Sequence, residues 1–147
     1  MELNYVAQTF TPQYTGSIQT FQFNVSSLAP GFTLTVELRD GGTPGAGNLL
    51  NTQNITINAL GWASVNYPPG VIVLHENQGY HFIVRPNAIN DDFLGIFISN
   101  VSPPGEHAGG TLYYYNDGSG EFDPDLVDDM DFRVISIVNN QTWVDLH

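Results

Sequence analysis

Residues that could bind a metal ion are concentrated near the C-terminal end of the sequence. Seven of the fifteen acidic residues lie between Asp117 and Asp131. Calcium takes about six to eight oxygen ligands from carboxylates, carbonyls and amide side chains on a flexible loop. Gly118 and Gly120 would allow backbone carbonyls to turn inward. The segment therefore contains one candidate calcium site, whose ligands would be Asp117, Glu121, Asp123, Asp125, Asp128 and Asp129.

The same acidic segment has a second interpretation that needs no metal. Its spacing does not match the Asp-x-Asp-x-Asp-Gly pattern of an EF-hand. A solvated acidic turn with local side-chain caps would have the same composition. Both interpretations stay open, and calcium is the one cofactor that the sequence suggests.

Three consecutive tyrosines precede the acidic segment and could contact a sugar. Sugar-binding sandwiches stack flat aromatic faces on pyranose rings and read the hydroxyls with polar side chains. Strand alternation sends Tyr114 to one face and its two neighbours to the other, so we expect at least one core tyrosine and at least one that faces solvent. The candidate ligand-binding residues are Tyr113, Tyr114, Tyr115 and Asn116. Tyrosine-rich strands are also common where no ligand binds.

Motifs of catalysis are missing from the sequence. The chain contains no Gly-x-Ser-x-Gly elbow and no His-Glu-x-x-His pattern. It has no cysteine, which excludes disulfides, zinc-thiolate sites and thiol nucleophiles. We therefore expect no enzymatic activity, and we expect its four histidines to be structural or exposed.

The composition restricts the classes of partner. Its 147 residues include no lysine and three arginines, and the net charge is -12. A surface of this charge repels phosphates, so nucleic-acid binding is not expected. The apolar runs are too short to insert into a membrane. The first residues, Met1–Tyr5, lack the basic start and the apolar core of a signal peptide.

Alternating hydrophobicity predicts an all-β fold. In the segment Phe32–Arg39, apolar residues at even positions would point inward, and Thr33, Thr35, Glu37 and Arg39 would point to solvent. The Gly-rich segment Asp40–Asn48 would end this strand as a loop. Eight to ten short strands of this kind predict one antiparallel β-sandwich domain of jelly-roll type over residues 1–147, with a polar tail from about residue 139.

Three further residues receive structural interpretations. Trp62 is expected in the core, and Trp143 is expected to pack on a neighbouring strand or on another subunit. In Asp129–Arg133, alternation places Arg133 on the same face as two aspartates, so we expect it to pair with a carboxylate.

Several short motifs resemble a family of β-sandwich domains from bacterial surface and secreted proteins. They are Ala7-Gln-Thr-Phe10, Leu34-Thr-Val-Glu-Leu-Arg39, Gly42-Thr-Pro-Gly45, Trp62, Leu74 with Tyr80-His-Phe-Ile-Val84, and Asp129-Met-Asp-Phe-Arg133. The resemblance implies a jelly roll similar to carbohydrate-binding and galactose-binding-like modules. It also implies an extracellular or surface-associated location and a role in adhesion, ligand binding or spacing.

Two functions follow from these observations. The first is a non-catalytic adhesion or binding module for a carbohydrate or another cell-surface ligand, with calcium as a candidate helper. The alternative is a self-associating structural subunit of a virion, a fibre or a surface appendage.

Overall fold

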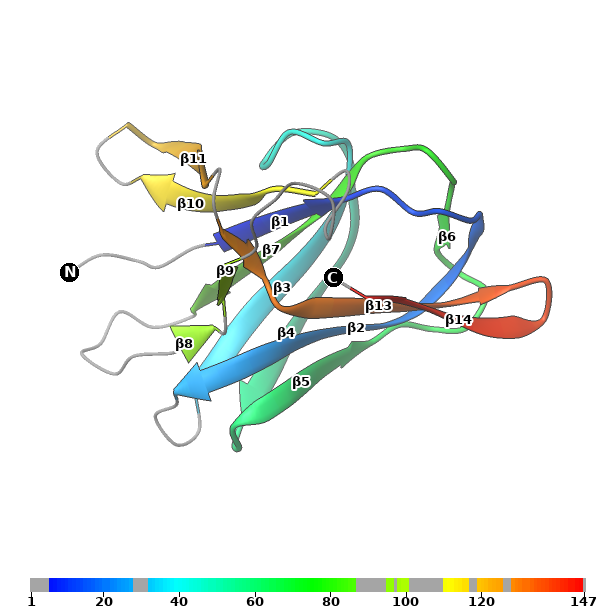
Figure 1. Cartoon of the computed structure of the whole chain (residues 1–147), viewed down its shortest axis with the longest axis horizontal. Coiled ribbons are helices and arrows are strands. Elements are labelled where there is room, and N and C mark those ends of the chain that lie inside the picture. Colours follow the sequence, from blue (N-terminus) through cyan, green and yellow to red (C-terminus); the bar gives the residue numbers. More distant parts are fainter. Residues whose placement is uncertain are drawn as a thin grey trace.

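The computed structural model describes residues 6–27, 32–86, 95–96, 98–100, 110–116, 119–125 and 128–146. These residues form strands and turns, with no helix among them. Figure 1 shows the strands as two stacked layers. The predicted all-β antiparallel sandwich is therefore confirmed.

The first layer, called sheet A, has six antiparallel strands in the order β11-β10-β1-β7-β3-β4. Their bounds are β1 Val6–Phe10, β3 Phe32–Asp40, β4 Leu49–Ile57, β7 Tyr80–Pro86, β10 Leu112–Asn116 and β11 Glu121–Asp125. Strands from both ends of the chain meet in this layer, because β1 lies between β7 and β10.

The second layer, called sheet B, has the order β14-β13-β2-β5, and two short strands also pair with β2. Its bounds are β2 Gly16–Ser27, β5 Gly61–Asn66, β6 Val73–Leu74, β8 Gly95–Ile96, β13 Phe132–Val138 and β14 Gln141–Leu146. A separate pair consists of β9 Ile98–Asn100 and β12 Asp128–Met130. Of the fourteen strands described, ten have five or more residues, which agrees with the expected eight to ten. The jelly-roll connection of these strands stays a prediction.

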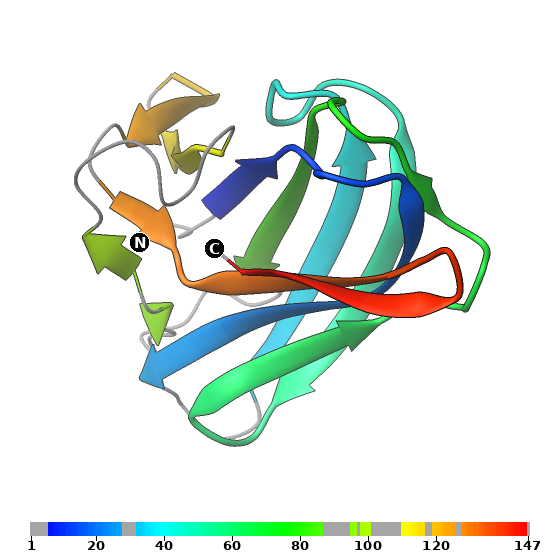
Figure 2. The same ribbon diagram turned by 45° about the vertical axis from the view of Figure 1, so that its right-hand side comes forward.

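Aromatic rings fill the space between the sheets. Phe21 of sheet B stacks on Phe82 of sheet A with ring centroids 3.7 Å apart, and Phe10 stacks on the same ring at 5.0 Å. Phe132 meets Phe10 edge to face at 6.5 Å. A buried phenylalanine contributes roughly 3–5 kcal/mol relative to alanine. This stack therefore holds together the two layers, whose ribbons are seen from a second direction in Figure 2.

Strand β3 shows where alternation predicts burial and where it does not. Leu34, Val36 and Leu38 point inward and are fully buried, as expected. Thr35 and Glu37 lie on the outer face, yet each is only 7% exposed. The expectation that both face solvent is wrong, because neighbouring side chains on that face cover them.

Two segments expected to be irregular contain strands. Residues 121–125 of the acidic segment form β11 against β10, and Asp128–Met130 form β12 against β9. The residues expected as a polar tail form β14, which pairs along its whole length with β13. Asn139 and Asn140 connect β13 to β14 with φ of 51° and 63°. This is a two-residue turn with positive φ at both positions, the geometry that suits the twist of a hairpin.

Candidate functional site

The predicted metal ligands do not form one loop in the structure. Glu121 and Asp123 lie on β11 and are exposed, and on this strand they alternate with Phe122 and Pro124. Asp125 also lies on β11, whereas Asp128 and Asp129 lie on β12 and therefore belong to another sheet. Asp117 lies outside the described residues. Among the side chains that the structure describes, no three acidic or histidine groups come together around a cation position.

The three tyrosines alternate along β10 as predicted. Tyr113 and Tyr115 lie on the outer face of sheet A and are partly buried, while Tyr114 points to the opposite side and is 37% exposed. None of the three tyrosines belongs to the core, so the expectation of one core tyrosine is wrong. The core residue of this strand is Leu112, which is 1% exposed. Asn116 ends β10 opposite Glu121.

Two of these aromatic residues form a cluster with β11. Tyr115 pairs with Phe122, and their rings meet edge to face at 5.4 Å. Two residues further along each strand, Tyr113 pairs with Pro124 on the same face. The outer face of the β10–β11 hairpin is therefore aromatic, and its other face carries Glu121 and Asp123.

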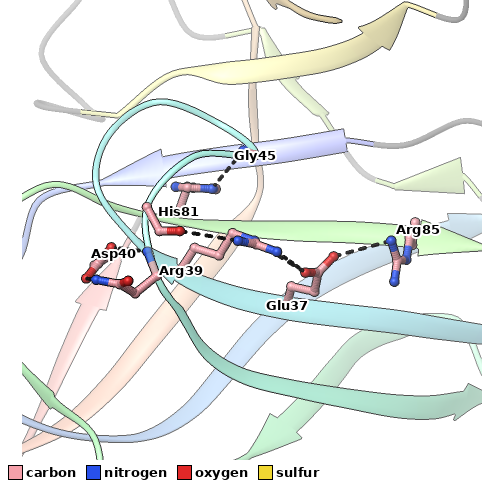
Figure 3. Close-up of polar contacts among 8 residues, drawn as sticks. Glu37, Arg39, Asp40, Gly45, His81 and Arg85 are labelled. Atoms are coloured by element: carbon pink, nitrogen blue, oxygen red, sulfur yellow. Dashed lines mark hydrogen bonds and ion pairs between the residues drawn. The ribbon is translucent and has the colours of Figure 1, made fainter. Parts of the chain in front are cut away.

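A second group on the outer face of sheet A is ionic. One carboxylate oxygen of Glu37 accepts hydrogen bonds from Arg39 Nη2 at 2.9 Å and from Arg39 Nε at 3.3 Å. Its other oxygen faces Arg85 Nη1 of the neighbouring strand at 3.4 Å. Figure 3 shows the carboxylate between the two guanidinium groups. Two of the three arginines in the chain thus meet at one glutamate.

The arginines remain accessible although the carboxylate is buried. The side chain of Arg85 is 40% exposed and that of Arg39 is 23% exposed, against 9% for Glu37. A guanidinium carries five N–H donors in one plane, and the described contact of Arg85 with Glu37 uses one nitrogen. In a chain of net charge -12, this cluster has one more positive than negative charge.

The loop of residues 41–48, between β3 and β4, folds back over the same face. It is held by His81 of β7, which is fully buried. Gly45 donates its backbone N–H to His81 Nε2 at 3.1 Å, and His81 Nδ1 lies 2.9 Å from the carbonyl oxygen of Gly41. A carbonyl only accepts, so Nδ1 carries the proton and donates while Nε2 accepts. The loop contacts therefore select one tautomer of the neutral ring.

Burial lowers the pKa of His81 from its ordinary value of 6.5. The hydrogen bond to Gly41 acts in the opposite direction, as do the charges of Glu37 and Asp40, while Arg39 adds to the lowering. A protonated ring would lose its acceptor nitrogen and could not bind the Gly45 N–H. The loop contact thus depends on the neutral form of His81.

The base of the loop is closed by Asp40 and Asn48. Asn48 donates its backbone N–H to one oxygen of the Asp40 carboxylate and its side-chain amide to the other at 3.0 Å. The backbone hydrogen bond, followed by the side-chain one, lowers the pKa of this carboxyl below its ordinary 3.8. Arg39 Nη1 also donates to the carbonyl of Gly47 at 3.4 Å, so the ionic cluster and the loop share one side chain.

The loop reaches from the ionic cluster toward the aromatic cluster. Gly45 lies against the ring of Phe122: a Cβ atom at position 45 would be 3.7 Å from Cε2 of that ring. Gly45 has a φ of 82°, in the region that favours glycine. The Gly-rich sequence predicts a loop here, but not the sheet face that the loop covers.

Strand register places the two clusters in one row. Val84 and Tyr114 both pair with Val6, so the following residues, Arg85 and Tyr115, point to the outer face on either side of β1. Strands lie about 4.8 Å apart, and these two backbone positions are therefore about 10 Å apart. This row of a cationic donor and an aromatic ring is the arrangement that we take as the candidate binding site.

The sequence carries a weak signal for the ionic half of this site. Arg39 and Arg85 are rare cations in an acidic chain, and an isolated glutamate within an apolar strand needs a partner if it is buried. The sequence does not show that β7 lies beside β3, and this pairing brings Arg85 to Glu37.

On the outer face of sheet B, Trp62 and Arg133 both differ from what the sequence predicts. Trp62 is 37% exposed on this face and is not in the core. The guanidinium carbon of Arg133 lies 3.7 Å from the centroid of the Trp62 ring. In the described residues, the contact of Arg133 is thus a cation–π contact rather than the expected carboxylate pair, and Asp131 instead accepts from Asn24 Nδ2 at 3.2 Å. The side chain of Trp143 lies outside what the structure describes.

Comparisons with protein-family models, with curated proteins and with solved structures find no match. The described residues include no helix of the length and apolarity needed to cross a membrane.

Proposed function

We propose that the protein is a non-catalytic binding module that recognises a carbohydrate, such as a cell-surface glycan, on the outer face of sheet A. The observation that carries this proposal is the row of Arg85 and Tyr115, two strands apart, beside the buried Glu37. The location that goes with this role is extracellular or surface-associated.

The chemistry of this face suits a sugar. A pyranose ring offers hydroxyl groups that donate and accept and an apolar face that packs on an aromatic ring. Arg85 would supply planar donors at one end of the row, and Tyr113 and Tyr115 would supply ring surface at the other. Ile83 and Ala7 lie in the same row as Tyr113 and are buried, so Arg85 and the tyrosines would provide the contacts.

The ionic cluster supports recognition more than catalysis. Each oxygen of Glu37 already faces an arginine. Such contacts hold the guanidinium groups in place before a ligand arrives, which reduces the entropy lost on binding. A glycosidase would need two carboxylates, about 5–9 Å apart, that act on the substrate.

In this proposal, calcium would stabilise the β10–β11 hairpin and would not contact the sugar. Glu121 and Asp123 lie on the β10–β11 hairpin, on the face opposite Tyr115 and Phe122. A cation bound there would relieve repulsion between carboxylates and stiffen the strand that presents the aromatic side chains.

A glycan array probed with and without calcium tests the proposal. Titration calorimetry with the best hit then compares Tyr113→Ala and Glu37→Gln with two matched controls, Tyr14→Ala and Glu76→Gln. Tyr14 and Glu76 are exposed residues outside the outer face of sheet A. We expect the two site variants to lose about tenfold or more in affinity, and the controls to stay within about twofold.

Two outcomes would contradict the proposal. One is the absence of any glycan hit under both calcium conditions. The other is a hit whose affinity is the same in Tyr113→Ala, in Glu37→Gln and in the controls. Thermal melting of each variant identifies a loss of binding that comes from unfolding, and Tyr113→Ala leaves the ion pairs in place if Glu37→Gln is too unstable.

A self-associating structural subunit is the second candidate function. The observation that favours it is the β14 edge of sheet B, with which no described strand other than β13 pairs.

A further inference from the structure

Among the described residues, the two strand orders end in four edge strands, and three of these either carry several charges or contact another edge strand. An unpaired edge attracts other strands unless charges, proline or neighbouring structure block it. β11 carries Pro124 and three acidic residues. β4 and β5 lie beside each other, and Gln53 of β4 donates to the carbonyl of Asn66 at the end of β5 at 2.8 Å.

The fourth edge, β14, has no such protection in the part of the chain that the structure describes. Its sequence, Gln141–Leu146, contains no proline and no lysine, and its one charged residue is Asp145. β14 pairs with β13 on one side, and no described strand pairs with it on the other. Figure 1 shows the hairpin of these two strands at one end of the molecule.

The hairpin geometry identifies the backbone groups that are free. A two-residue turn is closed by a hydrogen-bonded pair, here Val138 and Gln141, and bonded and non-bonded pairs then alternate. Gln141, Trp143 and Asp145 therefore bond to β13. The N–H and C=O groups of Thr142, Val144 and Leu146 point away from it.

We propose that β14 pairs antiparallel with β14 of a second copy of this chain across a two-fold axis. The axis would pass beside Val144, so that Val144 faces the partner's Val144, and Thr142 faces the partner's Leu146. In this register, all of the outward groups of these three residues find partners, in about six hydrogen bonds between the chains. The interface is isologous and closes at the dimer.

Side chains on the outer face agree with this register. Val144 is 45% exposed and pairs with Ile135 on the same face. The two-fold axis would extend this pair into an apolar row of four residues: Ile135, Val144 and their two equivalents in the partner. Cross-strand pairs of β-branched residues stabilise a sheet by roughly 0.2–1 kcal/mol each.

Charge favours this edge over β11 for a second copy. Two chains of net charge -12 repel each other, and the acidic β11 edges would bring carboxylates together. At β14, each chain contributes one carboxylate. Association should therefore strengthen with salt, which screens the repulsion between the remaining charges.

Sedimentation equilibrium of the whole chain at low and high salt tests this proposal, with Val144→Glu as the variant and Val71→Glu as its matched control. Both substitutions replace an exposed valine and add the same charge, but Val71 is 68% exposed and lies outside β14. We expect a dimer that strengthens with salt in the wild type and in Val71→Glu, and a monomer in Val144→Glu.

Amide exchange provides a second measurement that does not depend on the variant folding. At high protein concentration, the amides of Thr142, Val144 and Leu146 should exchange several-fold more slowly than at low concentration, while those of Gln22 and Ser64 should not change. A wild-type monomer at about 1 mM in high salt, or equal dimerisation of both variants, would overturn the proposal. Glycan binding is measured in a separate experiment, because the proposed sugar site lies on sheet A and β14 belongs to sheet B. A failure of one proposal can therefore be distinguished from a failure of the other.

Discussion

The outer face of sheet A carries a loop that is hydrogen-bonded to it, whereas the described outer face of sheet B carries side chains that pair across its strands. On sheet A, residues 41–48 lie over His81 and reach Phe122. On sheet B, Thr20 bonds Asn66 and Gln22 bonds Ser64, and all four side chains remain at least partly exposed.

This difference shows that facing outward and being exposed are separate properties. Both sheets alternate in the same way, as antiparallel sheets with one solvated face do. On sheet A, distant segments add a second layer of contacts, so that Glu37 and His81 are buried without being in the core. Polar residues buried in this way must be bonded, and fixed polar groups are what a binding site needs.

The largest expected effect comes from disturbing the loop on sheet A. Gly47 has a φ of 76°, and a Cβ atom there would overlap the backbone carbonyl of Asp40. We expect Gly47→Ala to lower the free energy of unfolding by about 2–3 kcal/mol in urea titrations. Gly42→Ala is the control, since nothing lies near its Cβ position, and it should change stability by less than about 0.5 kcal/mol. Equal effects of the two substitutions would mean that the loop is not held as described.

The second largest effect is expected in the pH dependence of stability, to which His81 on the outer face of sheet A contributes. The folded pKa of His81 is lowered, so below about pH 6.5 the unfolded chain takes up a proton that the folded chain does not. This contribution to stability is complete above pH 6.5 and is lost as the pH falls through the folded pKa, by about 1.4 kcal/mol for each unit of lowering.

Replacing His81 should remove this dependence. We expect His81→Gln to flatten the fall in the free energy of unfolding between pH 6.5 and about pH 5, where the carboxylates have hardly begun to titrate. His75→Gln, at an exposed position, should keep the wild-type slope. A wild-type slope in His81→Gln would contradict the role of the neutral ring in holding the loop.

The smallest effect is expected on sheet B. Arg133→Ala removes the cation above the Trp62 ring and should lower the free energy of unfolding by about 0.5–1 kcal/mol, as for other exposed cation–π pairs. Glycan affinity should not change, because this pair lies on the sheet opposite the proposed sugar site. A double-mutant cycle with Trp62→Ala measures the coupling, and a value near zero would show that the contact adds nothing.

Much of the fold could be predicted because strand alternation is a local property. Leu34, Val36 and Leu38 are predicted and found inward, and the loop at Asp40–Asn48 is found where the glycines predict it. The acidic segment was harder: its carboxylates suggest a solvated loop, yet pairing of β11 with β10 places Phe122 on Tyr115 and makes part of it a strand.

The candidate binding site could be predicted only in part. Tyr113 and Tyr115 are candidates by their type and spacing, and alternation places them on one face. Glu37 and Arg85 were not identified, since they are 48 positions apart and meet only because β3 and β7 are neighbours. Trp62 is expected in the core, but its strand presents it outward.

By itself, the sequence determined the strands, their inward residues and the glycine positions of the loop, because these depend on the period of the backbone and on its allowed φ. The tertiary structure alone decided which outer face would be covered, which charges would meet and which edge would stay free. Those outcomes depend on contacts between segments far apart in the chain, and no local pattern records them.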